Sequence, residues 1–429
     1  MKKFGIVFAG KALRVLSSLV VITLLSRSVD QEQFGKFSYA VSIYSVFIPF
    51  VVFGLENYVI RYYKGSKGIN LTHLLVANGI LSVFAILVFY FFSLNESHLI
   101  GFILLSVILA FSPVNYLLNA AQEHLLIAKV SLLVSSVSML LKVAIILLSD
   151  DVVQHLLLAF GLDFFLPVVL VAFVSKAKFR ISKIKLNSSY QLLSYSFPFF
   201  LSAAIVVLLN KTDQLMIPHL LDYEELAKYS LSYRLYEGLF VLHVVFNSLF
   251  FPLLAKKGLN KCIEIVGAFA VIWVFVIFLI SLILGISGPG LFSFLFGSEY
   301  RLSSFILILL SISLLPAFWG NVISKVAALT EGGGKALAYN NFFTLVANVI
   351  LNLVLIPLWG VFGAVFATIL SQLLGSVMVW FFYDQFKKTI ISILHVSYSS
   401  CIGAIRRPLQ VLTHIKAAMN QLIPTDKMA

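Results

Sequence analysis

The sequence predicts an all-α integral membrane protein with about twelve transmembrane helices in two parallel six-helix lobes. Hydrophobic residues make up 60% of the chain, charged residues make up 11%, and the mean hydropathy is +1.01. A water-soluble core cannot bury that much apolar surface, so lipid is the expected solvent. The apolar residues form continuous runs of about twenty, which is the length of a spanning helix, and not the alternating segments of a β-barrel. Backbone groups in lipid have to bond within their own segment, so these runs are expected to be helices.

The predicted spans follow one another closely, and the eleventh is short. They lie near Gly5–Ser26, Phe37–Ile60, Leu71–Ser93, Leu99–Leu117, Val130–Leu148, Val153–Val174, Leu192–Ile217, Ser230–Leu254, Ile263–Ile286, Phe305–Ala328, Asn341–Pro357 and Val361–Tyr383. After the last span, Thr389–Ala404 is only moderately apolar and is flanked by basic residues. We interpret it as a surface amphipathic helix, with a thirteenth span as the alternative.

The distribution of basic residues predicts the orientation in the membrane. With the N-terminus inside, about 21 lysines and arginines fall in cytoplasmic segments and about 4 fall in outer loops. This asymmetry follows the positive-inside rule, so both termini are expected in the cytoplasm. The net charge of +13 is therefore mostly membrane-surface charge. No soluble basic domain is expected that would bind nucleic acid.

The chain contains two similar halves. The segment Asp30–Ser38 follows the first span, and Asp222–Ser230 follows the seventh. Asp, Glu, Lys and Ser coincide in the two segments, and Tyr44 matches Tyr236; the alternative is chance likeness between two amphipathic loops. Both halves begin inside, so the repeat is parallel, and transporters built this way place their site between the halves near the midplane. The predicted division is an N-terminal lobe over 1–175, a basic linker over 176–190, a C-terminal lobe over 191–384 and a cytoplasmic tail over 385–429.

About six basic residues fall inside the apolar runs. A cation at mid-bilayer costs about 2.5–3.5 kcal/mol, so six facing lipid would cost on the order of 15 kcal/mol. They are therefore expected to line a wet cavity, and a cationic cavity suggests an anionic cargo. The candidate substrate-binding residues are Lys11, Arg14, Lys142, Lys211, Arg234 and Lys325. The candidate coupling or charge-balancing residues are Asp163, Asp213 and Glu237.

Several of these polar residues also have structural interpretations. Lys11 and Lys325 lie near the inner ends of their spans, where they can extend to the membrane surface. Lys142 and Asp163 can form an ion bridge between neighbouring helices. Asn341, Asn348 and Asn352 can join helices by hydrogen bonds. His243 and Asn247 share a face about 180° from Arg234, so the eighth span is not expected to present one continuous polar stripe.

No arrangement of residues typical of an enzyme occurs in the sequence. The paired acids Asp150–Asp151 and Glu224–Glu225 lie in short outer loops, where solvated charge is the better interpretation. The segment Gly332–Ala336 lacks the glycine spacing and the Ser/Thr of a phosphate-binding loop. Cys262 and Cys401 are expected to be free thiols. We therefore expect no catalytic residue, no cofactor and no metal.

Several stretches, taken in order, resemble one family. They are Leu24–Arg27, Phe53–Tyr62, Phe197-Pro198-Phe199, Lys211–Ile217 and Leu351–Ala364. Together they resemble the polysaccharide-unit transporters, the O-antigen (Wzx-type) flippases of the multidrug/oligosaccharidyl-lipid/polysaccharide exporter superfamily. The resemblance covers the chain to about Tyr383.

The resemblance implies a MATE-like architecture in the bacterial inner membrane. It also implies flipping of undecaprenyl-diphosphate-linked oligosaccharides from the inner to the outer leaflet, for O-antigen, capsule or exopolysaccharide synthesis. A polysaccharide polymerase and a chain-length regulator are the partners that it suggests. Charged residues in the lobes of such proteins line the cavity, and here the first, seventh and eighth spans supply Arg14, Lys211, Asp213 and Arg234.

Two other functions compete with this one. A cation-coupled multidrug antiporter of the same superfamily should have an acidic and aromatic site, whereas cations outnumber acids in the spans of this chain. A membrane glycosyltransferase or polymerase needs a catalytic loop, which the sequence does not contain.

Overall fold

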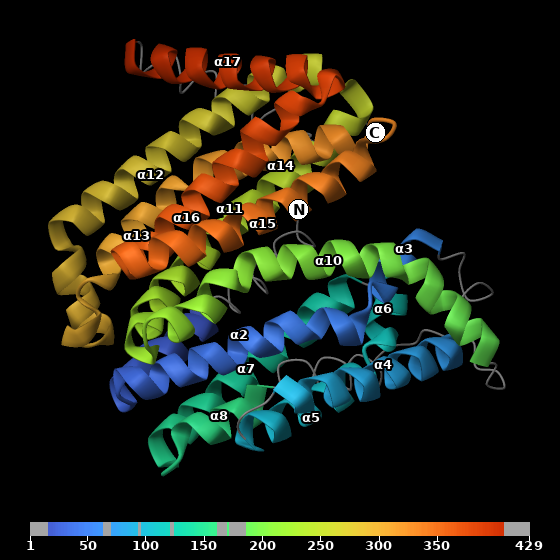
Figure 1. Ribbon diagram of the computed structural model, residues 1–429, viewed down its shortest axis with the longest axis vertical. Helices are drawn as coiled ribbons and strands as arrows, with labels where there is room; N and C mark the ends of the chain where they lie inside the picture. Colours follow the sequence, from blue (N-terminus) through green and yellow to red (C-terminus); the bar gives the residue numbers. More distant parts are fainter. Residues whose placement is uncertain are drawn as a thin grey trace. The chain divides into compact units, whose positions relative to one another are not determined.

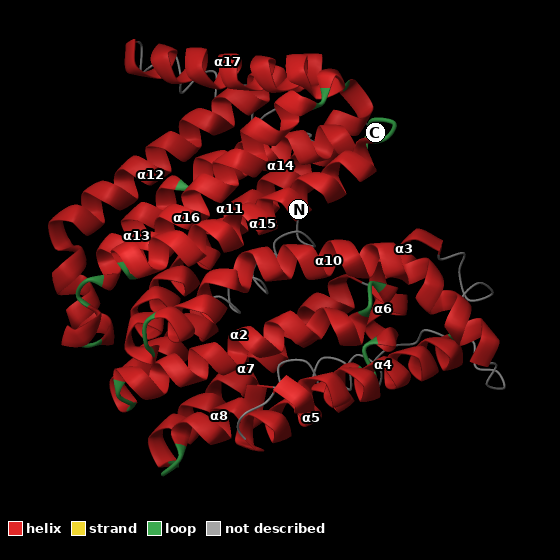
Figure 2. Cartoon of the chain, in the orientation of Figure 1, coloured by secondary structure: helices red, strands yellow, loops and turns green. Residues whose placement is uncertain are grey.

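The computed structural model describes residues 16–62, 70–92, 96–120, 124–160, 170 and 186–406. Within these ranges the chain forms helices joined by short turns, and it forms no strand (Figure 2). The predicted all-α fold is therefore confirmed. The start of the first predicted span, most of the second half of the sixth and the end of the tail lie outside the described residues.

The chain divides into two compact units, Met1–Leu215 and Met216–Ala429 (Figure 1). The division falls later than the predicted linker at 176–190. Helix α10 (Leu186–Leu220) packs for most of its length with the first unit; for example, Ser189 Oγ donates to the carbonyl oxygen of His73 at 3.2 Å. The division into two six-helix lobes follows the sequence repeat and stays a prediction.

The first unit contains short and long helices in succession. They are a helix over Leu16–Ser28, α2 (Gln31–Val52), α3 (Leu55–Tyr62), α4 (Leu71–Phe92), α5 (Glu96–Leu109), α6 (Pro113–Ala120), α7 (His124–Leu148), α8 (Val152–Phe160) and most of α10. The second unit contains α11 (Tyr223–Lys257), α12 (Leu259–Phe296), η1 (Ser298–Tyr300), α13 (Ser303–Ile312), α14 (Leu314–Ala328), α15 (Gly333–Trp359), α16 (Val361–Leu373), η2 (Leu374–Met378), η3 (Val379–Phe382) and α17 (Asp384–Arg406).

The helices coincide with the predicted spans. Seven described stretches are long and apolar enough to cross a membrane, and each overlaps one predicted span. The other predicted spans coincide with the helix over Leu16–Ser28 and with α5–α6, α7, α8 and α11. The eleventh span is not short, because α15 begins at Gly333 directly after a left-handed turn at Gly332. The helix α17 is not among the seven, and its interpretation as a surface helix stays a prediction.

Several spans are broken helices, and the first break lies at Phe53–Gly54 between α2 and α3. Both residues have positive φ, 48° and 68°. A Cβ atom on Gly54 would lie 2.6 Å from Cβ of Phe199 and from the backbone nitrogen of Phe200. The rings of Phe53 and Phe200 stack with centroids 4.5 Å apart. The break is therefore held in place by α10, and it requires glycine.

The break between α5 and α6 has a different partner. Pro113 has no N–H, so it cannot donate to the carbonyl oxygen of Leu109. That oxygen instead accepts hydrogen bonds from the Ser112 N–H at 3.0 Å and from Nδ2 of Asn78 on α4 at 2.7 Å. A buried asparagine thus adds a hydrogen bond to the backbone of a neighbouring helix at its break, which lipid cannot do.

The two repeated segments have the same local structure. Asp30 caps α2 by accepting a hydrogen bond from the Gln33 N–H at 2.7 Å, and Asp222 caps α11 by accepting one from the Glu225 N–H at 2.7 Å. In each copy the lysine pairs with a glutamate of the first helical turn, Lys36 with Glu32 and Lys228 with Glu225. The segments are helix starts with solvated ion pairs, and their match favours a true repeat.

We expect Gly54→Ala to destabilise the protein. The added methyl group would meet the backbone of α10, and an L-residue is strained at this φ, so a loss of about 2 kcal/mol or more is expected. The apparent unfolding midpoint in detergent measures it. Gly79→Ala is the matched control, because a Cβ atom there meets nothing within 4 Å. Equal midpoints for the two variants would contradict the tight fit at Gly54.

Labelling of single cysteines tests the predicted orientation. In a chain with Cys262 and Cys401 replaced by alanine, cysteines at the exposed positions Asp151 and Leu302 should react with a membrane-impermeant maleimide from the periplasm. A cysteine at the exposed Lys335 should react only after the membrane is opened. The reverse pattern would overturn the topology.

Candidate functional site

The first unit buries four consecutive polar residues near the end of α10. Lys211, Thr212, Asp213 and Gln214 are all less than 8% exposed. Four consecutive residues point to all sides of a helix, so the protein encloses α10 completely at this level. The charged side chains of Lys211 and Asp213 each have an interaction partner. A buried charge is tolerated only where polar groups compensate it, so this turn of α10 is a polar environment inside an apolar unit.

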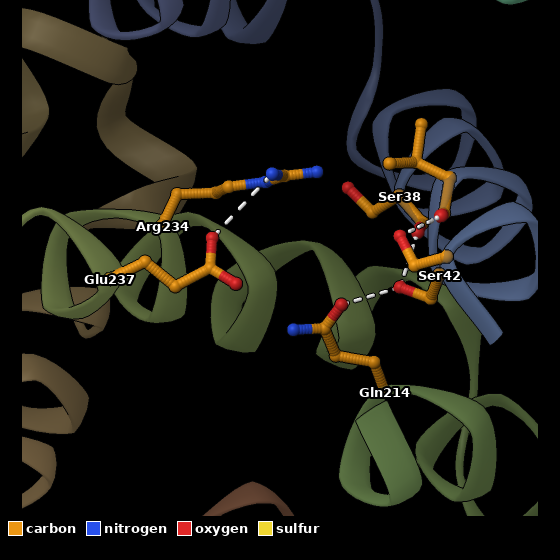
Figure 3. Close-up of polar contacts among 7 residues, drawn as sticks. Ser38, Ser42, Gln214, Arg234 and Glu237 are labelled. Carbon is orange, nitrogen blue, oxygen red and sulfur yellow. Dashed lines mark hydrogen bonds and ion pairs between the residues drawn. The ribbon is translucent and has the colours of Figure 1, made fainter. Parts of the chain in front are cut away.

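Helix α2 supplies part of that environment. Ser42 Oγ hydrogen bonds with Oε1 of Gln214 and also donates to the carbonyl oxygen of Ser38 at 2.8 Å (Figure 3). The hydroxyl has one proton, so it serves one of these acceptors at a time. Sequence reasoning named Lys211 and Asp213 but missed Ser42 and Gln214, because a serine in an apolar run gives no distinguishing signal.

In the second unit, Arg234 and Glu237 form an ion pair on one turn of α11. Nη1 of Arg234 lies 3.5 Å from Oε2 of Glu237, and the side chains are 30% and 38% exposed (Figure 3). A partly exposed pair of this kind contributes about 0–1 kcal/mol to stability. The guanidinium has five N–H donors, and this contact occupies one nitrogen. Arg234 can therefore still bind an anion.

The remaining candidates are spread over the chain. Lys142 lies half-buried on α7. Nζ of Lys325 on α14 lies 5.5 Å from the centroid of the Phe251 ring, a cation–π contact that accommodates a lysine at the end of a span. Lys11, Arg14 and Asp163 lie outside the described residues, so the predicted Lys142–Asp163 bridge stays a prediction.

A second face of α11 carries polar residues that join it to the broken tenth span. The contacts are Ser232 Oγ to Ser303 O at 2.7 Å, Tyr236 Oη to Ser313 Oγ at 2.9 Å, His243 Nε2 to Leu314 O at 3.2 Å and Asn247 Nδ2 to Asn321 Oδ1 at 3.3 Å. Helix α11 thus has a polar stripe, so the expectation of no continuous stripe was wrong: Ser232 and Tyr236 extend the face of His243 and Asn247. Arg234 lies outside this stripe. The stripe binds α13 and α14 on both sides of their break, so its role is structural.

An asparagine of α15 also joins two helices, and a second asparagine of α15 supports it. Nδ2 of Asn348 donates to Oγ of Ser371 on α16 at 3.2 Å, and Nδ2 of Asn352 donates to Oδ1 of Asn348 at 3.2 Å. The interpretation of Asn348 as an interhelical contact is confirmed.

The repeat relates the two candidate sites to each other. Counted from the capping aspartates Asp30 and Asp222, Ser42 and Arg234 occupy the same position in their helices. Tyr44 and Tyr236, which follow them by the same step, are both buried. One position of the repeat therefore carries a hydroxyl in the first half and a guanidinium in the second.

In sequence, the chain is similar to proteins described as polysaccharide biosynthesis proteins. The sequence model of a family described as "Polysaccharide biosynthesis protein" matches residues 1–257. The chain is 23% identical to "Capsular polysaccharide biosynthesis protein CapF" of Staphylococcus aureus over 406 residues, which is 90% of this chain and 99% of that protein.

Two solved structures share the fold. The structure titled "Lipid II flippase MurJ, inward closed conformation" matches with a TM-score of 0.67 at 14% identity, over 97% of this chain and 96% of that one. The eukaryotic MATE transporter AtDTX14 matches with a TM-score of 0.52 at 14% identity, over 93% and 98%. The predicted MATE-like fold is confirmed.

The contact between Tyr236 and Ser313 can be tested by removing one hydroxyl group. Ser313 donates its own proton to Leu310 O at 2.7 Å, so Tyr236 is the donor in the contact. Tyr236→Phe should lower stability by about 1 kcal/mol, a fall of roughly 2–4 °C in the unfolding midpoint, and leave export near normal. Tyr190→Phe, at an exposed tyrosine, should change neither. Lost export at an unchanged midpoint would instead show that Tyr236 contacts the cargo.

Proposed function

The chain belongs to the polysaccharide biosynthesis protein family, and from this we propose that it flips undecaprenyl-diphosphate-linked oligosaccharides. The direction of transport would be from the inner to the outer leaflet of the bacterial cytoplasmic membrane, with both termini of the chain in the cytoplasm. The observation that carries this proposal is the family match combined with the lipid II flippase fold. The released units would enter O-antigen, capsule or exopolysaccharide synthesis, where a polymerase and a chain-length regulator are the proposed partners.

The charges of the candidate residues support an anionic cargo. A diphosphate needs cationic donors, and an arginine can bind phosphate oxygens with two parallel hydrogen bonds. Arg234 is partly exposed and has donors that the Glu237 contact does not use. We propose that Arg14, Lys142, Lys211 and Arg234 attract the diphosphate. Lys11 and Lys325, at the inner ends of their spans, would provide the first encounter with the cargo.

Transport would proceed by alternating access, with no covalent bond made or broken. In this mechanism the lobes rock about the bound cargo, which is exposed first to the cytoplasm and then to the periplasm. Arg234 would exchange Glu237 for a phosphate when cargo binds. Glu237 is one candidate for coupling to a cation; Asp213 and Asp163 are the others.

The second candidate function is a cation-coupled multidrug antiporter, which the shared fold with AtDTX14 favours. A cationic drug would need an acidic site. In this chain the buried Asp213 lies within two residues of the buried Lys211, so the local charge is balanced. Unchanged drug resistance in a deletion strain that accumulates lipid-linked sugars would exclude this alternative.

Charge-removing substitutions test the cationic cavity. Arg14→Ala and Arg234→Ala should each reduce export at least about tenfold, the effect of losing one charge-assisted hydrogen bond, at near-normal protein levels. Lys142→Arg and Lys211→Arg should be tolerated better than the alanine variants, because they keep the charge. Arg301→Ala, at an exposed cation of an outer turn, is the control. The cavity model fails if all four alanine variants restore surface polysaccharide in a deletion strain.

The driving force can be measured in proteoliposomes. Two negative charges crossing roughly 150 mV gain about 7 kcal/mol from an inside-negative potential, although cavity cations that move with the cargo cancel part of this. Flipping should therefore respond to the potential and need no ATP. Protection of a fluorescent lipid-linked sugar from a membrane-impermeant quencher reports it. Flipping that continues unchanged after both potential and ion gradients are removed would indicate a downhill exchanger.

A further inference from the structure

Helix α17, the last helix among the described residues, lies across the ends of the spanning helices of the second unit (Figure 1). It contacts α12, α14 and η3. Its buried residues Phe386, Ile390, Ile393 and Ser397 recur at the spacing of one helical face. This face packs closely on α12, because a Cβ atom on Gly267 of α12 would lie 2.8 Å from Cγ1 of Val396. The position of α17 on the unit is therefore fixed, and so is the face that it turns outward.

That outer face is basic, with apolar residues between the charges. Lys387, Lys388 and His395 are exposed, and so are Ile391 (51%) and Tyr398 (67%). The helix ends at the exposed Arg406, and Asp384 at its start is its one acidic residue. A solvated helix face has no need of an exposed isoleucine and tyrosine beside its lysines. This mixture is typical of helices that lie in a membrane interface.

The end of the second unit that carries α17 is also its basic end. Exposed lysines lie there at the end of α11 and at the starts of α12 and α15. They are Lys256, Lys257, Lys261 and Lys335, and the exposed acids Glu264 and Glu331 lie beside them.

The opposite end of the unit has fewer basic and more acidic residues. Its basic residues include Arg301 and Lys228, and Lys228 pairs with Glu225. It also carries the exposed acids Asp222, Glu224 and Glu299. The positive-inside rule predicts that the basic end of the unit lies on the cytoplasmic side, which would place α17 at the level of the lipid headgroups.

We propose that α17 binds anionic phospholipid headgroups of the cytoplasmic leaflet. Lys387, Lys388 and Arg406 would contact the phosphate groups, and Ile391 and Tyr398 would enter the boundary between headgroups and acyl chains. Basic residues beside an anionic leaflet attract it within about one Debye length, and apolar side chains that enter the boundary anchor the helix. The helix would then fix the inner end of α12 relative to the membrane plane. This proposal does not depend on the cargo.

Native mass spectrometry of the full-length protein in detergent tests the proposal with two probes, phosphatidylglycerol and phosphatidylcholine. Lys387→Gln/Lys388→Gln should weaken phosphatidylglycerol binding by about tenfold or more and leave phosphatidylcholine binding unchanged. The control Lys256→Gln/Lys257→Gln removes the same charge at the same end of the unit and should retain tight binding. Equal binding by the first variant and the unmodified protein, or equal loss in both variants, would overturn the assignment to α17.

A second measurement locates the outer face directly. A fluorophore on a cysteine at Tyr398, with Cys262 and Cys401 replaced, should be quenched by spin-labelled lipids in proteoliposomes and be shielded from iodide in water. Quenching by iodide alone would show that the face is in water, where an acidic cytoplasmic protein would be its partner, and would overturn lipid binding. The replaced lysines and Tyr398 are exposed, so the lysine variants should unfold at the midpoint of the unmodified protein, and the Tyr398 variant at that of the parent chain that lacks Cys262 and Cys401.

Discussion

Every spanning segment of this protein has to satisfy its backbone hydrogen bonds without water, and the packing of both units depends on that constraint. Where a helix breaks, a side chain of another helix donates to its backbone, or a glycine in the break lets its backbone pack closely on another helix. Asn78 donates to the carbonyl oxygen of Leu109 at one break, and His243 donates to that of Leu314 at another. At Gly54 the backbone itself packs on α10. The breaks are therefore the places where one helix fixes the geometry of the next.

The same constraint explains how much of the fold could be predicted. A run of apolar residues in lipid has few alternatives to a helix, so hydropathy located the spans and the fold class. The breaks could not be predicted, because they depend on contacts between residues far apart in the chain, such as Asn78 with Leu109. The prediction that the eleventh span is short was wrong for a related reason. The polar first turns of α15 are helical, but they do not look like part of an apolar run.

The candidate site was predicted only as a set of charges. A lysine or arginine in an apolar run is conspicuous because of its cost, so Lys211 and Arg234 could be named from sequence. Their surroundings could not be named, since Ser42 and Gln214 are ordinary residues until α2 and α10 pack together. Other polar residues in a span turn out to be structural. Tyr236, His243 and Asn247 lie in α11, and their side chains hydrogen bond with residues at the break and in α14.

The matching helix starts at Asp30 and Asp222 have a consequence for the history of the molecule. Two helices capped by the same residue, with the same tyrosine further along, are the pattern that duplication of a gene for a half-sized ancestor leaves. Ser42 and Arg234 occupy the same position in the two copies, so the copies differ in charge there. A transporter made of two identical chains carries the same residue at both positions, whereas a single chain with two copies can carry this charge once.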